Sequence, residues 1–132
     1  MRRIVLLGLA LLVGTVTSLE AQDTVVIQRF KCDLNEIESL RAQADTIWIP
    51  IADELVSEGK FQYVQVLERD MGDEWNVLWY YRAADMETFR AAYEEWLVRV
   101  EDRFPGANAM YNRDCPEYTQ YSYLSVSHTR NE

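Results

Sequence analysis

The side chains that could transfer a proton or hold a metal ion are few in this 132-residue sequence. His128, near the C-terminal end, is the only histidine. One histidine cannot build a multi-histidine zinc site, and it can form the Cys–His pair of a thiol hydrolase only with a free cysteine. We therefore expect His128 to be an exposed tail residue, with proton transfer as the alternative role.

Carboxylates gather at Asp70, Asp73 and Glu74, around a glycine. Calcium needs six to eight oxygen ligands, and this spacing lacks the rest of a calcium-binding loop, so a turn explains these residues better. No serine stands in a nucleophile elbow, and no glycine-rich loop follows a predicted strand. The sequence therefore predicts no metal, no cofactor and no assignable catalytic residue, and it leaves open whether the protein is an enzyme.

Tryptophan and tyrosine are unusually abundant. The simplest interpretation is that these side chains fill a core and a subunit interface. Both side chains carry polar ends that need partners when buried, so a pocket lined by them suits a flat apolar ligand with one or two hydrogen-bonding groups. The candidate ligand-binding residues are Trp48, Trp79, Tyr80 and Tyr93. The wider aromatic set adds Trp75, Tyr81, Trp96, Tyr121 and Tyr123.

The N-terminal segment has the three-part layout of a secretory signal peptide. Met1-Arg2-Arg3 is positive, residues 4–16 are uncharged and mostly apolar, and Ala21 ends the segment with a small side chain. A membrane anchor needs about 20 apolar residues, whereas this run is shorter and contains two glycines. Residues 1–21 are therefore predicted to be a signal peptide.

Cleavage is expected after Ala21, with Ser18 as the alternative, so residues 22–132 form one domain. The mature protein is expected in the periplasm or outside the cell, without membrane attachment. The whole chain has a net charge of −9 at pH 7, and loss of the segment makes it more negative. Nucleic acid and anionic lipid are not expected as partners, because an acidic chain repels both.

Four strands are predicted after this segment. Residues 24–30 are rich in β-branched side chains and too few for a helix. Residues 61–69 and 75–81 predict a hairpin around a turn with glycine and aspartate. Residues 118–126 return to strand-like composition.

Two helices are predicted between the strands. Asp33 can cap a helix over residues 33–58 that ends at Gly59, with a kink or break near Ile49 because Pro50 lacks an N–H donor. Asp85 can cap a second helix, ended by Pro105-Gly106, with a polar loop over residues 112–116. The apolar face of the second helix comprises Met86, Phe89, Tyr93, Trp96, Leu97, Val100 and Phe104.

The resulting order, strand-helix-strand-strand-helix-strand, is that of the ferredoxin-like α+β fold, in which both helices cover one face of an antiparallel sheet. The strand over residues 75–81 carries apolar or aromatic side chains on both sides, as with Trp79 and Tyr80. A sheet with one face in water alternates apolar with polar residues, so a second subunit is expected to cover the other face. The predicted partner is a second copy of the chain.

On this element order and these two-sided strands, residues 24–127 resemble the dimeric α+β barrel proteins, such as antibiotic-biosynthesis monooxygenases and NIPSNAP-like proteins. The resemblance implies a homodimer whose sheets pack face to face. It also implies a cavity between sheet and helices, used by some relatives to oxidise aromatic substrates without metal or flavin. Haem-binding members use a histidine, which adds haem ligation to the alternatives for His128.

The two cysteines are expected to pair, because exported chains usually form disulfides and no Cys-X-X-Cys spacing indicates a redox-active pair. In the ferredoxin-like order the last strand lies antiparallel beside the first. Cys32 follows the first strand and Cys115 precedes the last, so these ends are neighbours. The sequence thus predicts an exported, disulfide-linked homodimer that binds a small apolar or aromatic ligand, with a cofactor-independent oxygenase or isomerase as the alternative.

Overall fold

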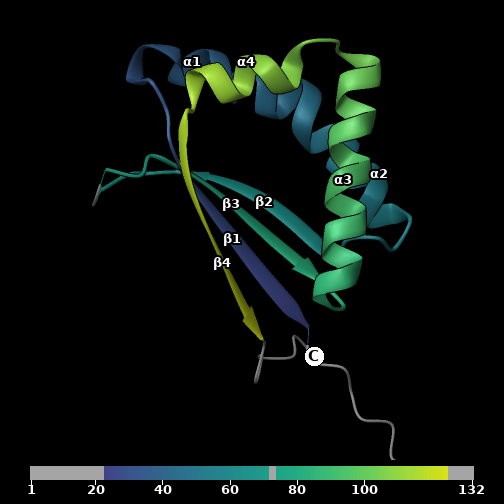
Figure 1. Ribbon diagram of the computed structural model, residues 1–132. Coiled ribbons are helices and arrows are strands. Elements are labelled where there is room, and N and C mark those ends of the chain that lie inside the picture. Colours follow the sequence, from purple (N-terminus) through teal and green to yellow (C-terminus); the bar gives the residue numbers. More distant parts are fainter. Residues whose placement is uncertain (1–22, 72–73, 125–132) are drawn as a thin grey trace, which may run out of the picture.

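A four-stranded antiparallel sheet carries the helices on one face (Figure 1). The structure is a computed structural model that describes residues 23–71 and 74–124. The strand order β2-β3-β1-β4 confirms the predicted ferredoxin-like α+β fold. The elements are β1 (Thr24–Lys31), η1 (Leu34–Glu36), α1 (Ile37–Gln43), η2 (Ala44–Trp48), α2 (Ile49–Ser57), β2 (Tyr63–Glu68), β3 (Val77–Ala83), α3 (Met86–Arg103), α4 (Ala107–Asp114) and β4 (Glu117–Leu124).

β1 lies in the interior of the sheet, between β3 and β4. Its alternation places Val26 and Phe30 on the buried, helix-facing side. Ile27 lies on the opposite side, where the register sets it between Tyr80 of β3 and Tyr121 of β4. The sheet therefore has one face packed under helices and one face that carries aromatic side chains away from them.

The predicted helix over residues 33–58 is present as consecutive helical segments, η1 to α2. Asp33 caps its start, because its side chain accepts the backbone N–H two residues on. Pro50 has no N–H, and the turn before it, η2, is π-helical, with the N–H of Ile49 bonded to the carbonyl of Ala44. The predicted break is thus a change of helix type at Ile49 rather than an interruption.

Glycines end both long helical stretches as predicted. Gly59 (φ 76°) and Gly106 (φ 88°) adopt the left-handed conformation that ordinary side chains avoid. Asp85 caps α3 by accepting a hydrogen bond from Thr88 N at 2.7 Å. Phe104, expected on the apolar face of the helix, instead follows its last residue and is exposed.

The prediction of a polar loop over residues 112–116 is wrong, because residues 112–114 belong to helix α4. Its apolar signal is short: Ala107 is buried and Tyr111, four residues later, packs on the core. Asn112, Arg113 and Asp114 follow, and these polar residues gave the segment its loop-like composition. Helix α4 also contributes side chains to a cavity beneath it.

Helices α2 and α3 are joined by ion pairs. Arg99 of α3 contacts both carboxylate oxygens of Glu58 at 2.8 Å, and it also pairs with Glu95, four residues earlier on the same helix, at 2.5 Å. Lys60 lies 2.7 Å from Glu95. Hydrogen bonds from Arg99 and then Lys60 lower the pKa of Glu58 to about 2.

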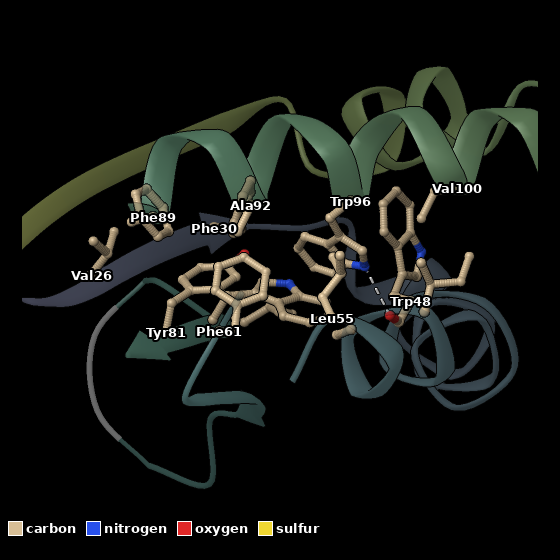
Figure 2. Packing of buried hydrophobic residues seen from close by; sticks show 14 of the residues in the cluster. Val26, Phe30, Trp48, Leu55, Phe61, Tyr81, Phe89, Ala92, Trp96 and Val100 are labelled. Atoms are coloured by element: carbon tan, nitrogen blue, oxygen red, sulfur yellow. Dashed lines mark hydrogen bonds between the residues drawn. The ribbon is translucent and has the colours of Figure 1, made fainter. Parts of the chain in front are cut away.

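Aromatic rings fill the core between sheet and helices (Figure 2). Trp96 of α3 donates from Nε1 to the carbonyl of Trp48 at 3.0 Å, and the two rings meet edge to face with centroids 5.7 Å apart. Tyr81 of β3 packs against Trp96 and against Phe89. The contact between Trp48 and Trp96 ties the end of η2 to the middle of α3.

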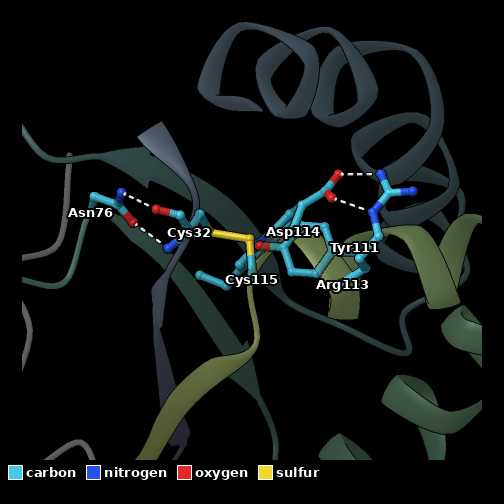
Figure 3. Close-up of a disulfide and its surroundings, with 7 residues drawn as sticks. Cys32, Asn76, Tyr111, Arg113, Asp114 and Cys115 are labelled. Carbon is cyan, nitrogen blue, oxygen red and sulfur yellow. Dashed lines mark hydrogen bonds and ion pairs between the residues drawn. A yellow bond between two sulfur atoms is a disulfide. The ribbon is translucent and has the colours of Figure 1, made fainter. Parts of the chain in front are cut away.

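The predicted bridge between Cys32 and Cys115 is confirmed, with an S–S distance of 2.03 Å (Figure 3). It joins the end of β1 to the start of β4. Buried Asn76 holds Cys32 in place, because its side chain accepts from Cys32 N and donates to Cys32 O, both at 2.8 Å. At the end of α4, Arg113 pairs with buried Asp114 at 2.7 Å.

The sheet face opposite the helices is uncovered in the single chain. Tyr121 and Tyr123 of β4 are exposed on it, and so is Tyr63 of β2. The guanidinium of Arg29 stacks over the rings of Tyr121 and Trp75, at 5.0 and 5.5 Å from their centroids. This face is rich in aromatic side chains, as the two-sided strands predicted.

Several predictions concern residues outside the described ranges, namely the signal peptide at 1–21, Asp73 in the hairpin turn, His128 and the end of the last strand. No helix in the described ranges is both long enough and apolar enough to cross the bilayer. Within residues 23–71 and 74–124, no three His, Cys, Asp or Glu side chains are placed to hold a metal ion together. Glu74 of the turn contacts Lys31 at 3.3 Å.

Candidate ligand-binding cavity

A cavity of about 340 Å³ lies between the sheet and the helices. β1 and β3 form its floor, α3 and α4 its walls, and β4 one edge. Its volume is within the range of small-molecule sites, and most of its lining is aromatic. The lining residues are Gln28, Phe30, Trp48, Trp79, Tyr81, Tyr93, Trp96, Leu97, Asn108, Tyr111, Asn112 and Tyr118.

Hydrogen bonds hold several of these side chains in place. Trp79 donates from Nε1 to the hydroxyl of Tyr111 at 2.7 Å. Tyr81 donates to Oε1 of buried Gln28 at 2.9 Å, and Gln28 donates in turn to Gln120 of β4 at 2.9 Å. The polar ends of the floor are therefore mostly paired within the protein, as buried tyrosine and tryptophan require.

The cavity carries no formal charge on any described lining residue. Burial raises the pKa of Tyr81 well above its usual range, and burial likewise raises the pKa values of Tyr93 and Tyr111. The three phenols are therefore protonated at neutral pH. A charged ligand would lose its hydration without gaining a counter-charge, so the cavity favours an uncharged one.

Two polar atoms of the lining are buried without a hydrogen-bond partner among the described residues, Nε1 of Trp48 and Oδ1 of Asn108. Trp48 is only 4% exposed. An unsatisfied buried polar group costs about 1–3 kcal/mol, so native structures rarely keep one without a reason. One is a donor and the other an acceptor, and a ligand hydroxyl could pair with either.

The structure brings together three of the four predicted ligand-binding residues. Trp48, Trp79 and Tyr93 all line the cavity. Tyr80 does not, because neighbouring residues of a strand point to opposite faces. It lies on the uncovered face, with its ring 5.9 Å from that of Tyr63.

Sequence reasoning missed the contribution of α4. Asn108, Tyr111 and Asn112 reach the cavity only because this segment is helical. The spacing of Ala107, Met110 and Tyr111 after a glycine was the available signal, three and four residues apart. Gln28 was missed because the sequence of its strand does not reveal which residues its side chain will contact.

Comparison with solved structures supports the fold. The chain is similar to a NIPSNAP family protein from Agrobacterium tumefaciens str. C58, with a TM-score of 0.66 and 9% identity over 82% of this chain and 90% of that one. It is also similar to a dimeric ferredoxin-like protein from an uncultured marine organism, with a TM-score of 0.61 and 12% identity over 86% and 95% of the chains. No family model matches the sequence, and no curated protein does.

A third similar structure is a Nitrosomonas europaea protein described as an antibiotic biosynthesis monooxygenase, with a TM-score of 0.62 and 12% identity over 83% of this chain and 96% of that one. At such identities the likeness shows a shared fold and not a shared activity. The chain is therefore a ferredoxin-like α+β protein. Its structural neighbours are those that the sequence resemblance indicated.

Proposed function

We propose that this chain is an exported, homodimeric protein that binds a small, uncharged, apolar or aromatic ligand in the cavity beneath α3 and α4. The observation that carries the proposal is the aromatic, charge-free lining around a space of about 340 Å³. Nε1 of Trp48, which has no hydrogen-bond partner within residues 23–71 and 74–124, is a donor for an oxygen of the ligand. A planar ring system with a hydroxyl or carbonyl group fits this chemistry.

The homodimer rests on the uncovered sheet face. Tyr63, Leu67, Tyr121 and Tyr123 are between 43% and 53% exposed on it, which is unusual for large side chains of one sheet. Contiguous apolar surface of this kind marks interaction sites. Similar solved structures are described as dimeric, and a two-fold partner would bury the same face of both chains.

Export rests on the layout of residues 1–21 and is compatible with the bond between Cys32 and Cys115, because disulfides persist in oxidising compartments. The chain should be expressed with its N-terminal segment in a bacterium and recovered from the periplasm. Native mass spectrometry is expected to give a dimer of chains lacking residues 1–21 and two hydrogens each. A monomer, or an uncleaved chain, would contradict that part of the proposal.

Ligand binding can be tested with 1-naphthol, monitored by isothermal titration calorimetry. Replacing Trp48 by Phe keeps an aromatic ring and removes the unpaired N–H, so the Kd for 1-naphthol is expected to rise about 2- to 10-fold. Tyr80→Phe, on the other face of the sheet, is the control and should leave the Kd unchanged. The proposal fails if the wild type does not bind 1-naphthol, or if both variants change the Kd equally.

A cofactor-independent oxygenase or isomerase is the second candidate, favoured by the description of one structural neighbour as a monooxygenase. Such an enzyme needs a group that accepts a proton near neutral pH. Raised pKa values keep the cavity tyrosines protonated there, which favours binding over this chemistry. Oxygen uptake or product formation with a naphthalene diol, lost in Tyr111→Phe, would support the enzyme instead.

A further inference from the structure

A second cavity, of about 240 Å³, lies on the other side of the residue pair Trp79 and Tyr111. It is enclosed by α1, η2, β2 and β3, with apolar side chains from Leu40, Ala44, Val66 and Val77. The first cavity opens instead toward α3 and β4. Alone, the second space is smaller than most small-molecule sites, so it is better suited to extend another site than to act independently.

Trp79 and Tyr111 are the only described residues that line both cavities. Trp79 rises from the sheet, Tyr111 comes down from α4, and the bond from Nε1 to the hydroxyl joins them at 2.7 Å. Two flat side chains joined at their polar ends form a partition one residue thick. Tyr111 lies beside the disulfide that ties the end of α4 to the end of β1, so the helix backbone is anchored close to this residue (Figure 3).

One neutral hydrogen bond joins the polar ends of the partition, and the loss of such a bond changes a population by about tenfold or less. The pair borders both cavities, and its rings also pack within the core, Tyr111 on Phe30 and Trp48 and Trp79 on Tyr81 and Trp96. The π-helical turn η2 reaches both spaces, with Ala44 at the second cavity and Trp48 at the first, and π-helical turns frequently occur at functional sites.

We infer that Trp79 and Tyr111 form a gate between two halves of one site, and that the ligand is elongated: an uncharged ring system in the first cavity and an apolar chain that passes the gate into the second. This inference rests on the proposed function. It adds the shape of the ligand, which the first cavity alone does not define. Exposed Arg41, Asp45 and Glu68 also line the second cavity, and Arg41 and Glu68 form an ion pair at 2.7 Å, which leaves the chain end near polar surface.

The test uses 4-alkylphenols from methyl to heptyl with the full mature chain. Affinity for the wild type is expected to rise about fourfold per added methylene, because each moves from water into an apolar space. Ala44→Leu fills the second cavity and is expected to abolish this increase beyond the shortest chains, while the Kd for 1-naphthol stays unchanged. Ala42→Leu, the same substitution at an exposed position of α1, is the matched control and should keep the increase.

An equal dependence on chain length in wild type and Ala44→Leu would overturn the gate and leave ligand binding intact. Failure of the wild type to bind 1-naphthol would overturn the proposed function itself, so the two failures are distinguishable. If Ala44→Leu does not fold, Val66→Phe fills the same cavity from the edge strand β2 and serves in its place. Retained dependence on chain length in a folded Val66→Phe variant would equally refute the inference.

Discussion

Asn76 is a polar residue placed where the core would otherwise leave backbone unpaired. It is 6% exposed and satisfies both the N–H and the carbonyl of Cys32. These groups lie just beyond the end of β1, where the strand ladder no longer supplies partners. The Asn76 side chain therefore supplies the two hydrogen bonds to the Cys32 backbone that a neighbouring strand would supply inside the sheet.

Replacing Asn76 by Ala is expected to lower the free energy of unfolding by about 2–4 kcal/mol, because two buried backbone groups lose their partners. Urea denaturation followed by circular dichroism measures the change. Asn35→Ala removes an amide from an exposed position and should cost less than 1 kcal/mol. A loss for Asn76→Ala as small as that control would show that water replaces the side chain.

At the residue scale the sequence could predict which side chains are suited to a cavity but only partly where they lie. Trp79 and Tyr80 are adjacent, so the two-residue period of a strand sends them to opposite faces and only one could have joined Trp48. Both faces of the strand are aromatic, and pattern alone did not say which of them meets the helices. The partners that Gln28 finds on β3 and β4 depend on tertiary register and could not be read from its neighbours.

The helical segments were predictable because local signals mark their ends. Asp33 and Asp85 cap them and Gly59 and Gly106 end them, each by backbone chemistry that needs no tertiary contact. Helix α4 was not predicted because it spans eight residues, only about two turns. Its stability comes from docking on α3 and from the disulfide at its end, neither of which is a local property.

Helices α2 and α3 should separate more easily in acid. The pKa of Glu58 is about 2 in the fold and close to 4.5 in an unfolded chain, so its ion pairs contribute fully above pH 4.5 and are lost as the pH falls toward 2. We expect Glu58→Gln to melt below the wild type at pH 7 in low salt, with the difference disappearing near pH 2. Thermal unfolding at pH 7, 4, 3 and 2 tests this.

Glu94→Gln is the control for that series, since Glu94 lies exposed on α3, next to the ion-paired Glu95. Its melting difference from the wild type should stay small across the pH range. Because Glu58 and its partners are at least partly exposed to solvent, salt should also reduce the effect of Glu58→Gln. A difference for Glu58→Gln that persists at pH 2 would mean that lost packing, and not lost charge, causes it.

For the whole molecule, the disulfide closes a loop with a sequence separation of 83 residues. Because such a bond restricts the conformations of the unfolded chain, it raises the free energy of unfolding by about 2–4 kcal/mol. A Cys32→Ala, Cys115→Ala double variant is expected to lose that much free energy of unfolding and to keep the sheet. Guanidinium titration of both proteins without reductant gives the difference, and a loss below 1 kcal/mol would contradict it.

The same bond makes the chain a covalent ring with two tails. Residues 32–115 form the ring and contain the hairpin and every described helix, whereas β1 and β4 leave it side by side as a paired stem. One cut by a protease in the ring, for example beside exposed Met71, would leave both pieces linked and of unchanged total mass apart from one added water. A cut within the stem would release a fragment. The turn between β2 and β3 lies within the ring, so a single cut there leaves the two pieces covalently linked.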